Sequence, residues 1–382
     1  MDIQPFTINI SPYIIEDLRE RLGRARWPDE ISGSGWEYGT NMDYLRELCT
    51  HWGHGYDWKE QEAALNCFHH YQAKVDDFCL HFIHEQGTGI RRIPLLLIHG
   101  WPDSFVRFLK LAPLLTNAGS DGVAFDLVIP SIPGFGFSEK PSKPGMDTGK
   151  CAELFAGLMK GLGYKKYMVH GGDTGSGIAE EMALQFPGRI IGLHLTDLPY
   201  QHLLMRKPED LKPVEKAWFA AGQQWQMQEG AYALEQATKP QTLAYALNDS
   251  PAGLAAWIIE KFHSWSDCDG NLETVYTRDE LLNNLTIYWV TQTAGSAARI
   301  YYEGMHHPRR EEQKIKIPSA FYISPKDLVP APREAAERIF TVKQWTEPPR
   351  GGHFAAWEQP QLLAEDLFRF SRICSAQPEP AA

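Results

Sequence analysis

The segment HGGDTGSG, residues 170–177, decides which fold the rest of the chain can adopt. It contains Asp-Thr-Gly-Ser, a string typical of the catalytic turn of an aspartic protease, and it also places glycines on both sides of Asp173, as in a sharp strand-to-helix turn. A protease of that class needs a second such string on an equivalent lobe, and the only candidate, at Asp147, is too near and opens a helix. We therefore favour the strand-turn-helix interpretation, with a plain helix N-cap role for Asp173 still open.

The segments around Asp173 alternate between strand and helix patterns. YMVHGG reads as a buried strand, and SGIAEEMALQF after the turn has helical periodicity. The alternation extends from about residue 93 to residue 198, where the other predicted strands are IPLLLIHG, AFDLVIPSIPG and IIGLHLTDLP. This pattern predicts an α/β fold, in which a mostly parallel sheet carries helices on both faces.

The alternation stops near Pro199, where the chain becomes rich in helical and aromatic patterns, and it resumes at the strand IPSAFYIS. We expect the intervening segment to be a helical lid inserted into the core. Four parts are predicted: an N-terminal helical meander that packs on core and lid (1–90), the first part of the core (91–199), the lid (200–316) and the second part of the core (317–382).

Composition limits the partners that the chain can bind. Its 382 residues are 43% hydrophobic, which supports a sizeable core, and its net charge is −11 without a Lys/Arg-rich run. This excludes nucleic acid and anionic membrane surfaces as expected partners. Six scattered cysteines indicate free thiols, and no apolar run is long enough to span a bilayer. We expect a cytoplasmic protein without a membrane anchor, and its oligomeric state, a homodimer included, stays open.

Two downstream residues supply the partners that a catalytic Asp173 needs. In folds built on such a turn, the nucleophile, the acid and the histidine follow in this order along the chain. Asp327 comes just after a predicted strand in ISPKDLVP, and His353 lies on a glycine-rich loop in RGGHFAAWE. Asp327 would orient His353 and stabilise its cationic form, although a simple turn role for Asp327 is also open. The order predicts a triad of Asp173, Asp327 and His353.

An oxyanion site is predicted at the loop HGWPDSF, residues 99–105, which follows an earlier strand. The backbone N–H groups of Trp101 and Thr174 are the natural donors. We expect the peptide between Trp101 and Pro102 to be cis. The alternative is a simple turn with a tryptophan in the core.

Five strings, in order, resemble motifs of the α/β-hydrolase-fold epoxide hydrolases, in the branch that includes the microsomal enzyme: HGWPDSF, GGDTGSG, ALNDSPAGLAAWIIEKF, IYWVTQTAGSAARIYYE and RGGHFAAWEQP. RERLGRARWPDE is similar to the N-terminal meander of that branch. The resemblance covers nearly the whole chain and implies the α/β-hydrolase fold. It also implies an enzyme that turns a small lipophilic epoxide and water into a vicinal diol, with no cofactor and no metal.

The resemblance further implies two lid tyrosines that face the epoxide oxygen, at Tyr232 and at Tyr301. Tyr302 is adjacent to Tyr301 and stays an alternative. Thr174 departs from the family pattern, because relatives often carry a tryptophan or an aliphatic residue there. Only its backbone N–H is needed for the oxyanion, so we expect the chemistry to survive with a more polar floor of the pocket.

An aspartate nucleophile suits epoxide opening because it forms an ester that water can cleave, whereas a serine would form a stable ether. Tyrosine hydroxyls keep their protons at neutral pH and can stabilise the emerging alkoxide. Two alternatives stay open at this point. One is a haloalkane or haloacid dehalogenase that uses the same ester chemistry, and the other is a catalytically silent ligand-binding protein of the same fold.

Overall fold

The structure is a computed structural model, and it describes residues 1–119, 121–199, 201–204, 209, 211–307 and 313–375. In these residues one sheet has the strand order β1-β2-β3-β5-β4-β6-β7-β8-β9. Pairing is antiparallel from β1 to β5 through β3 and parallel from β5 to β9. The strands are β1 (Ile3–Pro5), β2 (His70–Val75), β3 (Phe78–Glu85), β4 (Arg91–Ile98), β5 (Val123–Pro130), β6 (Tyr167–Gly171), β7 (Ile190–Leu195), β8 (Ile315–Tyr322) and β9 (Phe340–Thr346).

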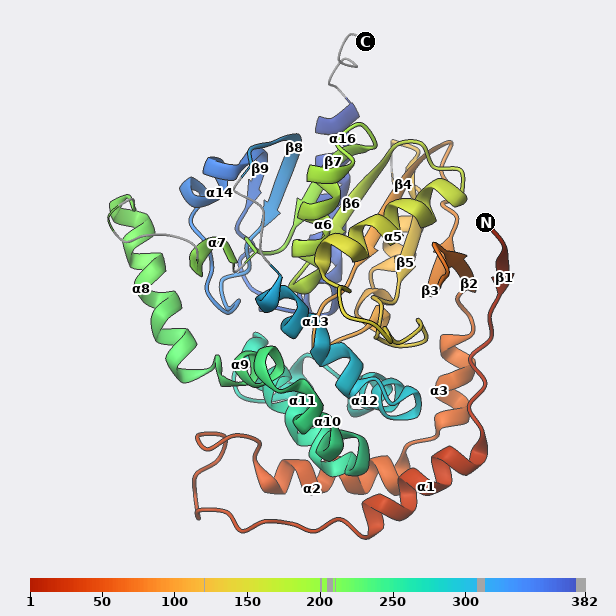
Figure 1. The fold of residues 1–382 in the computed structure, drawn as a ribbon, viewed down its shortest axis with the longest axis vertical. Coiled ribbons are helices and arrows are strands. Elements are labelled where there is room, and N and C mark those ends of the chain that lie inside the picture. Colours follow the sequence, from red (N-terminus) through yellow and green to blue (C-terminus); the bar gives the residue numbers. More distant parts are fainter. Residues whose placement is uncertain (120, 200, 205–208, 210, 308–312, 376–382) are drawn as a thin grey trace.

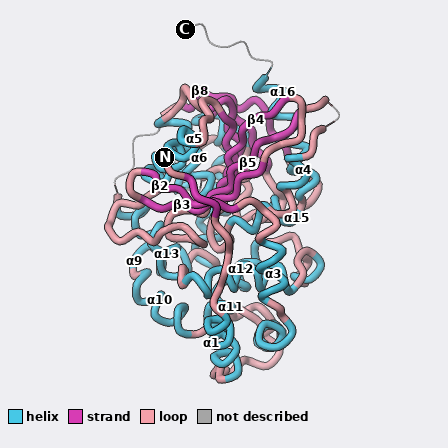
Figure 2. Tube along the Cα trace, turned by 90° about the vertical axis from the view of Figure 1, so that its right-hand side faces the viewer, coloured by secondary structure: helices cyan, strands magenta, loops and turns pink. Residues whose placement is uncertain are grey.

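The parallel part of the sheet confirms the α/β prediction. Every residue of β5 and of β6 is buried, which is why these strands are almost continuously apolar rather than alternating. Helices α5 and α6 cover one face, while α4 and α16 cover the other (Figures 1 and 2). The core helices are α4 (Ala112–Thr116), α5 (Thr148–Gly161), α6 (Thr174–Gln185), α14 (Arg333–Ile339), α15 (Ala355–Glu358) and α16 (Pro360–Ser375).

The described part of the segment between β7 and β8 is helical, as the sequence predicts, and α9 to α12 of it lie below the core in Figure 1, while α8 stands to the left. After α7 (Gln201–Leu204), the helices are α8 (Pro213–Gln228), α9 (Ala231–Thr238), α10 (Pro240–Asp249), α11 (Pro251–Trp265), α12 (Arg278–Thr291) and α13 (Ala294–His306). α12 and α13 are separated at Gln292, whose left-handed φ of 51° ends α12. This helical layer covers the end of the sheet at which Asp173 follows β6.

The N-terminal segment contains strands as well as helices. Its helices are α1 (Pro12–Gly23), α2 (Met42–Thr50) and α3 (Trp58–Leu65). In Figure 1, α1 and α2 pass under the lid and contact α11, while α3 lies at the right beside α12. The sequence predicts a helical meander over residues 1–90, but residues 70–85 form the β2–β3 hairpin instead. Its two turn residues, Asp76 and Asp77, both have positive φ, of 47° and 64°. Such turns usually contain Asn-Gly or Asp-Gly, so the Asp-Asp sequence is a weak hairpin signal.

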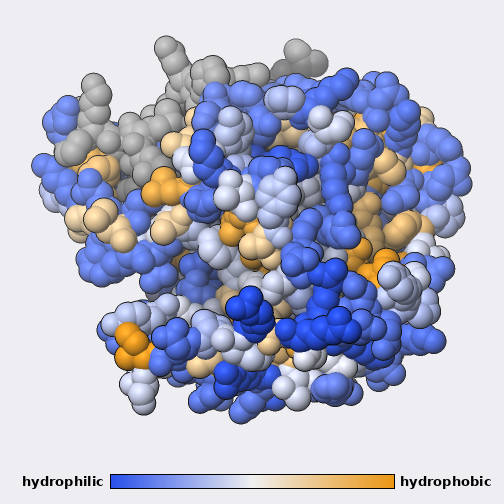
Figure 3. Space-filling model, turned by 60° about the horizontal axis from the view of Figure 1, so that its bottom comes forward, coloured by the Kyte–Doolittle hydropathy of each residue, from blue (hydrophilic) through white to orange (hydrophobic). Residues whose placement is uncertain are grey.

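The surface over the lid and the N-terminal helices is mostly hydrophilic, with hydrophobic residues scattered between polar ones (Figure 3). No helix in the described ranges has the length and apolar character to cross a membrane. All six cysteines lie in the described part of the chain and are free thiols. The division of the chain at residues 90, 199 and 316 stays a prediction.

Candidate active site

Asp173 occupies a strained turn between β6 and α6. Its φ of 59° and ψ of −129° lie outside the regions that L residues normally adopt. A Cβ on Gly175 would collide with the carbonyl oxygen of Ile98, so glycine is required there for the turn to pack against β4. The side chain of Asp173 accepts no capping hydrogen bond from α6. By contrast, Asp147 caps α5 by accepting the N–H of Lys150 at 2.8 Å.

Hydrogen-bond donors converge on one oxygen of Asp173. The backbone N–H of Trp101 donates to Oδ1 at 2.8 Å, and the backbone N–H groups of Trp101 and Thr174 both lower the pKa of this carboxylate. The hydroxyl of Thr174 donates to the same Oδ1 at 2.9 Å. The predicted cis peptide between Trp101 and Pro102 is confirmed. Trp101 and Thr174 therefore lie next to Asp173, and their role as oxyanion donors stays a prediction.

His353 lies between the two aspartates that the sequence groups with it. Its Nδ1 is 2.7 Å from Oδ1 of Asp327, and its Nε2 is 3.5 Å from Oδ2 of Asp173. Burial lowers the pKa of His353, but the charges of Asp327 and Asp173 outweigh burial and raise it to about 10. Burial likewise raises the pKa of Asp173, but His353 and the two N–H groups hold it below its usual value. The resting site therefore contains a carboxylate beside an imidazolium.

The loop that carries His353 is anchored through its main chain. The N–H of His353 donates to the carbonyl of Trp265 at 2.8 Å. One carboxylate oxygen of Glu358 accepts the N–H of Gly352 at 2.8 Å, and the other accepts the N–H of Phe354 at 2.9 Å. Sequence reasoning gave Glu358 no role, although its place five residues after His353, at the end of the same motif, was a signal.

The two predicted lid tyrosines meet above Trp101. Tyr232 of α9 stacks on the Trp101 ring with centroids 4.9 Å apart. Tyr301 of α13 shares a hydrogen bond with Tyr232, and burial together with the charges of Tyr232 and Asp173 raises its pKa far above the usual value. Tyr302 is 38% exposed and stacks on His306 instead. The structure therefore places Tyr301, and not Tyr302, on the side of Asp173.

Two family models together match nearly the whole chain. Residues 3–108 match the model described as Epoxide hydrolase N terminus, and residues 93–360 match the model described as alpha/beta hydrolase fold. Epoxide hydrolase 1 of Oryctolagus cuniculus is 35% identical over an alignment of 413 residues, which covers 98% of this chain and 90% of the relative. This chain belongs to the epoxide hydrolases.

Solved structures of epoxide hydrolases have the same fold. Juvenile hormone epoxide hydrolase from the silkworm Bombyx mori matches with a TM-score of 0.87 and 31% identity, over 98% of this chain and 94% of that chain. The epoxide hydrolase of Aspergillus niger matches with a TM-score of 0.85 and 28% identity, over 98% of this chain and 97% of that chain. These relatives favour the epoxide hydrolase interpretation over the dehalogenase and over the silent binding protein.

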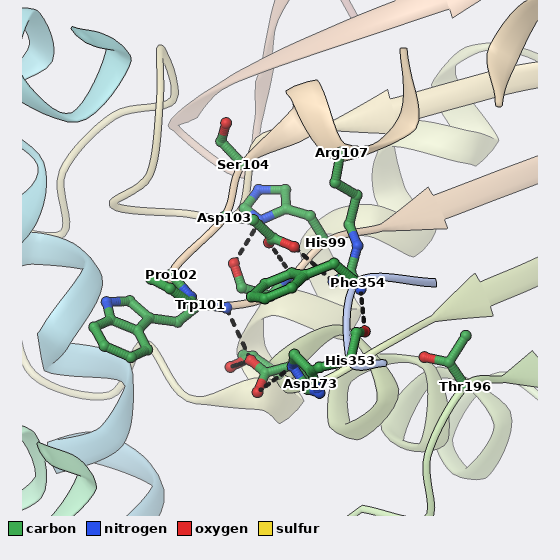
Figure 4. A network of polar contacts seen from close by, with 12 residues as sticks. His99, Trp101, Pro102, Asp103, Ser104, Arg107, Asp173, Thr196, His353 and Phe354 are labelled. Atoms are coloured by element: carbon green, nitrogen blue, oxygen red, sulfur yellow. Dashed lines mark hydrogen bonds and ion pairs between the residues drawn. The ribbon is translucent and has the colours of Figure 1, made fainter. Parts of the chain in front are cut away.

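A buried ion pair in this epoxide hydrolase links the oxyanion loop to the His353 loop. Arg107 Nη1 lies 2.8 Å from Oδ2 of Asp103, and Arg107 Nη2 donates to the carbonyl of His353 at 3.0 Å. Oδ1 of Asp103 accepts the N–H of Gly100 at 3.0 Å. Figure 4 shows Arg107 between Asp103 and the main chain of His353. Sequence reasoning missed both residues, because Asp103 and Arg107 also fit an ordinary i,i+4 surface pair.

The lid holds the same oxyanion loop from the other side. Asn284 of α12 donates to the carbonyl of Pro102 at 2.8 Å and accepts the hydroxyl of Ser104 at 2.8 Å. Tyr288, one turn later, donates to the carbonyl of Asp103 at 3.0 Å. The position of the Trp101 N–H in the epoxide hydrolase therefore depends on contacts with both the core and the lid.

Asp197 is a further carboxylate beside Asp173, and sequence reasoning missed it. Its Oδ1 accepts the backbone N–H of Asp173 at 2.9 Å and the hydroxyl of Ser176 at 2.7 Å. Burial and the charge of Asp327 raise the pKa of Asp197 to about 7. Its place just after β7 was an available signal, because functional residues of open α/β sheets gather at the carboxyl ends of the strands.

Proposed function

We propose that this epoxide hydrolase works through a covalent ester on Asp173. Oδ2 of Asp173 attacks a ring carbon of the epoxide, the ring C–O bond breaks, and the bond electrons move to the ring oxygen. Water then cleaves the ester and releases a vicinal diol. The observation that carries this proposal is the unequal environment of the two carboxylate oxygens. Oδ1 accepts from Trp101 and Thr174, whereas Oδ2 faces His353 at 3.5 Å and is left for attack.

Tyr232 and Tyr301 act on the ring oxygen in the first step. Their hydroxyls share a hydrogen bond above Trp101, and the pKa of Tyr301 lies far above its usual value. Tyr301 therefore stays protonated at neutral pH and can donate to the ring oxygen. Donation is strongest when the oxygen becomes an alkoxide, so it lowers the barrier to ring opening.

His353 acts as the general base in the second step, and ester formation makes this possible. In the resting enzyme, the charge of Asp173 contributes to raising the pKa of His353 to about 10. The ester carries no charge, so that contribution is lost and the pKa of His353 falls. His353 then releases its proton to solvent, while the alkoxide takes one proton from Tyr301, which solvent reprotonates, so the protons of the first step balance. His353 can then take a proton from water, while Asp327 stabilises the resulting imidazolium. The donors at Oδ1 hold the tetrahedral oxyanion.

This coupling predicts the direction of a pKa change. We expect the pKa of His353 to be lower in Asp173→Asn than in the unmodified enzyme, because the amide lacks the negative charge. The pH titration of the His353 Cε1 proton by NMR measures both values. Asp147→Asn, which makes the same substitution at a distant helix cap, serves as the matched control and should leave the titration unchanged. The same His353 pKa in all three proteins would contradict the coupling.

The proposed function is tested by a single turnover in heavy-oxygen water with enzyme in excess over epoxide. The oxygen added to the substrate comes from Oδ2 of Asp173, so the first diol should contain only ordinary oxygen. Heavy oxygen should then appear in the peptide that contains Asp173. Heavy oxygen in the diol after one turnover would show direct attack by water and would overturn the ester mechanism.

The substrate class that we propose is a small lipophilic epoxide. Four aromatic side chains lie against one another beside the catalytic groups, with ring centroids 4.9 to 6.1 Å apart: Trp101, Tyr232, Trp265 and Tyr301. Apolar walls with a few polar groups are typical of sites for such ligands. We expect kcat/KM to rise with the apolar surface of the epoxide.

A further inference from the structure

The hydroxyl of Thr174 has a partner that its usual role in a helix does not explain. Thr174 is the first residue of α6, and its Oγ1 donates to Oδ1 of Asp173 at 2.9 Å. Threonine hydroxyls inside helices commonly bond to the carbonyl three or four residues earlier, but for Thr174 these residues belong to β6 and not to α6. Here the carbonyl of Gly171, three residues earlier, already accepts from the N–H of Thr196 and the hydroxyl of Ser176, both at 3.1 Å.

The oxygen that Thr174 contacts is the one that changes charge during the reaction. Oδ1 also accepts the N–H of Trp101 at 2.8 Å, so a side-chain donor and a backbone donor meet on a single atom. We propose that the Thr174 hydroxyl is a further catalytic donor of the oxyanion hole, which speeds cleavage of the ester and slows its formation. This inference rests on the ester mechanism proposed above and adds a side chain to a site expected to use backbone groups alone.

Ester cleavage is the step that the hydroxyl should favour. His353 takes a proton from water, the water oxygen bonds to the carboxyl carbon, and the electrons of the C=O double bond move onto Oδ1. A neutral carbonyl oxygen thereby becomes an oxyanion, and hydrogen bonds to a charged acceptor are stronger than those to a neutral one. Collapse of this intermediate breaks the bond to the diol oxygen, which takes a proton from His353. The contact of Thr174 is thus stronger in the transition state than in the ester.

The hydroxyl of Thr174 should have the opposite effect on the rate of ester formation. Before attack, Asp173 is a carboxylate whose charge the hydroxyl of Thr174 stabilises. As Oδ2 bonds to carbon, that charge passes to the ring oxygen near Tyr232 and Tyr301, and the contact at Oδ1 weakens. The hydroxyl therefore stabilises the ground state of this step more than its transition state. A residue with a purely structural role would not affect the two steps with opposite signs.

The test compares Thr174→Val, which keeps the shape and removes the hydroxyl, with Thr174→Ser, which keeps the hydroxyl. Rapid mixing with a styrene-type epoxide, followed by acid quench and intact-protein mass measurement, gives the rates of ester formation and loss. In Thr174→Val, we expect the ester to disappear about tenfold to hundredfold more slowly, while it forms at least as fast as in the unmodified enzyme. In steady state, kcat and KM should fall together with kcat/KM maintained. Thr174→Ser should restore ester loss to within a few-fold.

Two results would overturn the role of Thr174. One is equal slowing of both steps in Thr174→Val, and the other is a Thr174→Ser variant as slow in ester loss as Thr174→Val. Thermal unfolding of each variant, together with the amount of ester formed per protein, shows whether the chain is folded and competent. The proposed function has a separate test. It would be refuted if the unmodified enzyme turned over epoxide in heavy-oxygen water without labelling Asp173, so failure of the Thr174 role and failure of the ester mechanism are distinguishable.

Discussion

His353→Gln is expected to capture one molecule of epoxide on Asp173 and to release diol about 10²- to 10⁴-fold more slowly than the unmodified enzyme. Glutamine can occupy the space of the imidazole but cannot take a proton from water, so the ester forms and persists. Intact-protein mass after mixing with mono- and disubstituted epoxides should increase by one whole epoxide. Peptide mapping should place the added mass on the peptide that contains Asp173.

The control for this result is a second substitution in the same protein. Asp173→Asn combined with His353→Gln should take up no epoxide, because the amide is a poor nucleophile. Short haloalkanes in the same panel test the dehalogenase. An adduct that forms only with a haloalkane and lacks the halide would contradict epoxide hydrolysis. Saturable binding without an adduct, in a folded protein, would favour a silent binding protein.

The double variant Tyr232→Phe with Tyr301→Phe has the second large expected effect, which is slower formation of the ester. Phenylalanine retains the ring that packs on Trp101 and removes only the hydroxyl. The alkoxide then develops without a donor, and we expect ester formation to slow by about 10²- to 10⁴-fold. Single-turnover mixing with excess enzyme measures this rate directly.

Tyr302→Phe is the matched control for the lid tyrosines. It removes the same hydroxyl from the neighbouring position of α13, where the residue is 38% exposed and its ring stacks on His306. Its rate of ester formation should stay close to that of the unmodified enzyme. Unchanged turnover in the double variant, with thermal stability retained, would exclude both tyrosines from ring opening.

Much of the catalytic centre follows from short segments of the sequence. The strand, the turn at Asp173 and the helix after it are adjacent in the chain, so local periodicity and glycine positions predict them. The order of Asp173, Asp327 and His353 follows from the order of the strands that carry them. The contrast between Asp147 and Asp173 shows the limit of this reasoning, because both stand in Asp-Thr-Gly strings and only Asp147 caps a helix.

Other features depend on contacts between residues far apart in the chain. Arg107 reaches the carbonyl of His353 across 246 positions, and no local pattern specifies such a contact. The choice between Tyr301 and Tyr302 depends on how α13 is rotated against the core.

The tertiary structure also decided the acceptor of the Thr174 hydroxyl. Thr174 is adjacent to Asp173 in the sequence, but the carbonyl of Gly171, three residues before it, accepts the N–H of Thr196 from the end of β7. Sequence alone therefore determined the α/β fold class and the order of Asp173, Asp327 and His353, because strand and turn patterns are local. Packing determined which side chains converge on Asp173, because hydrogen bonds depend on positions in space.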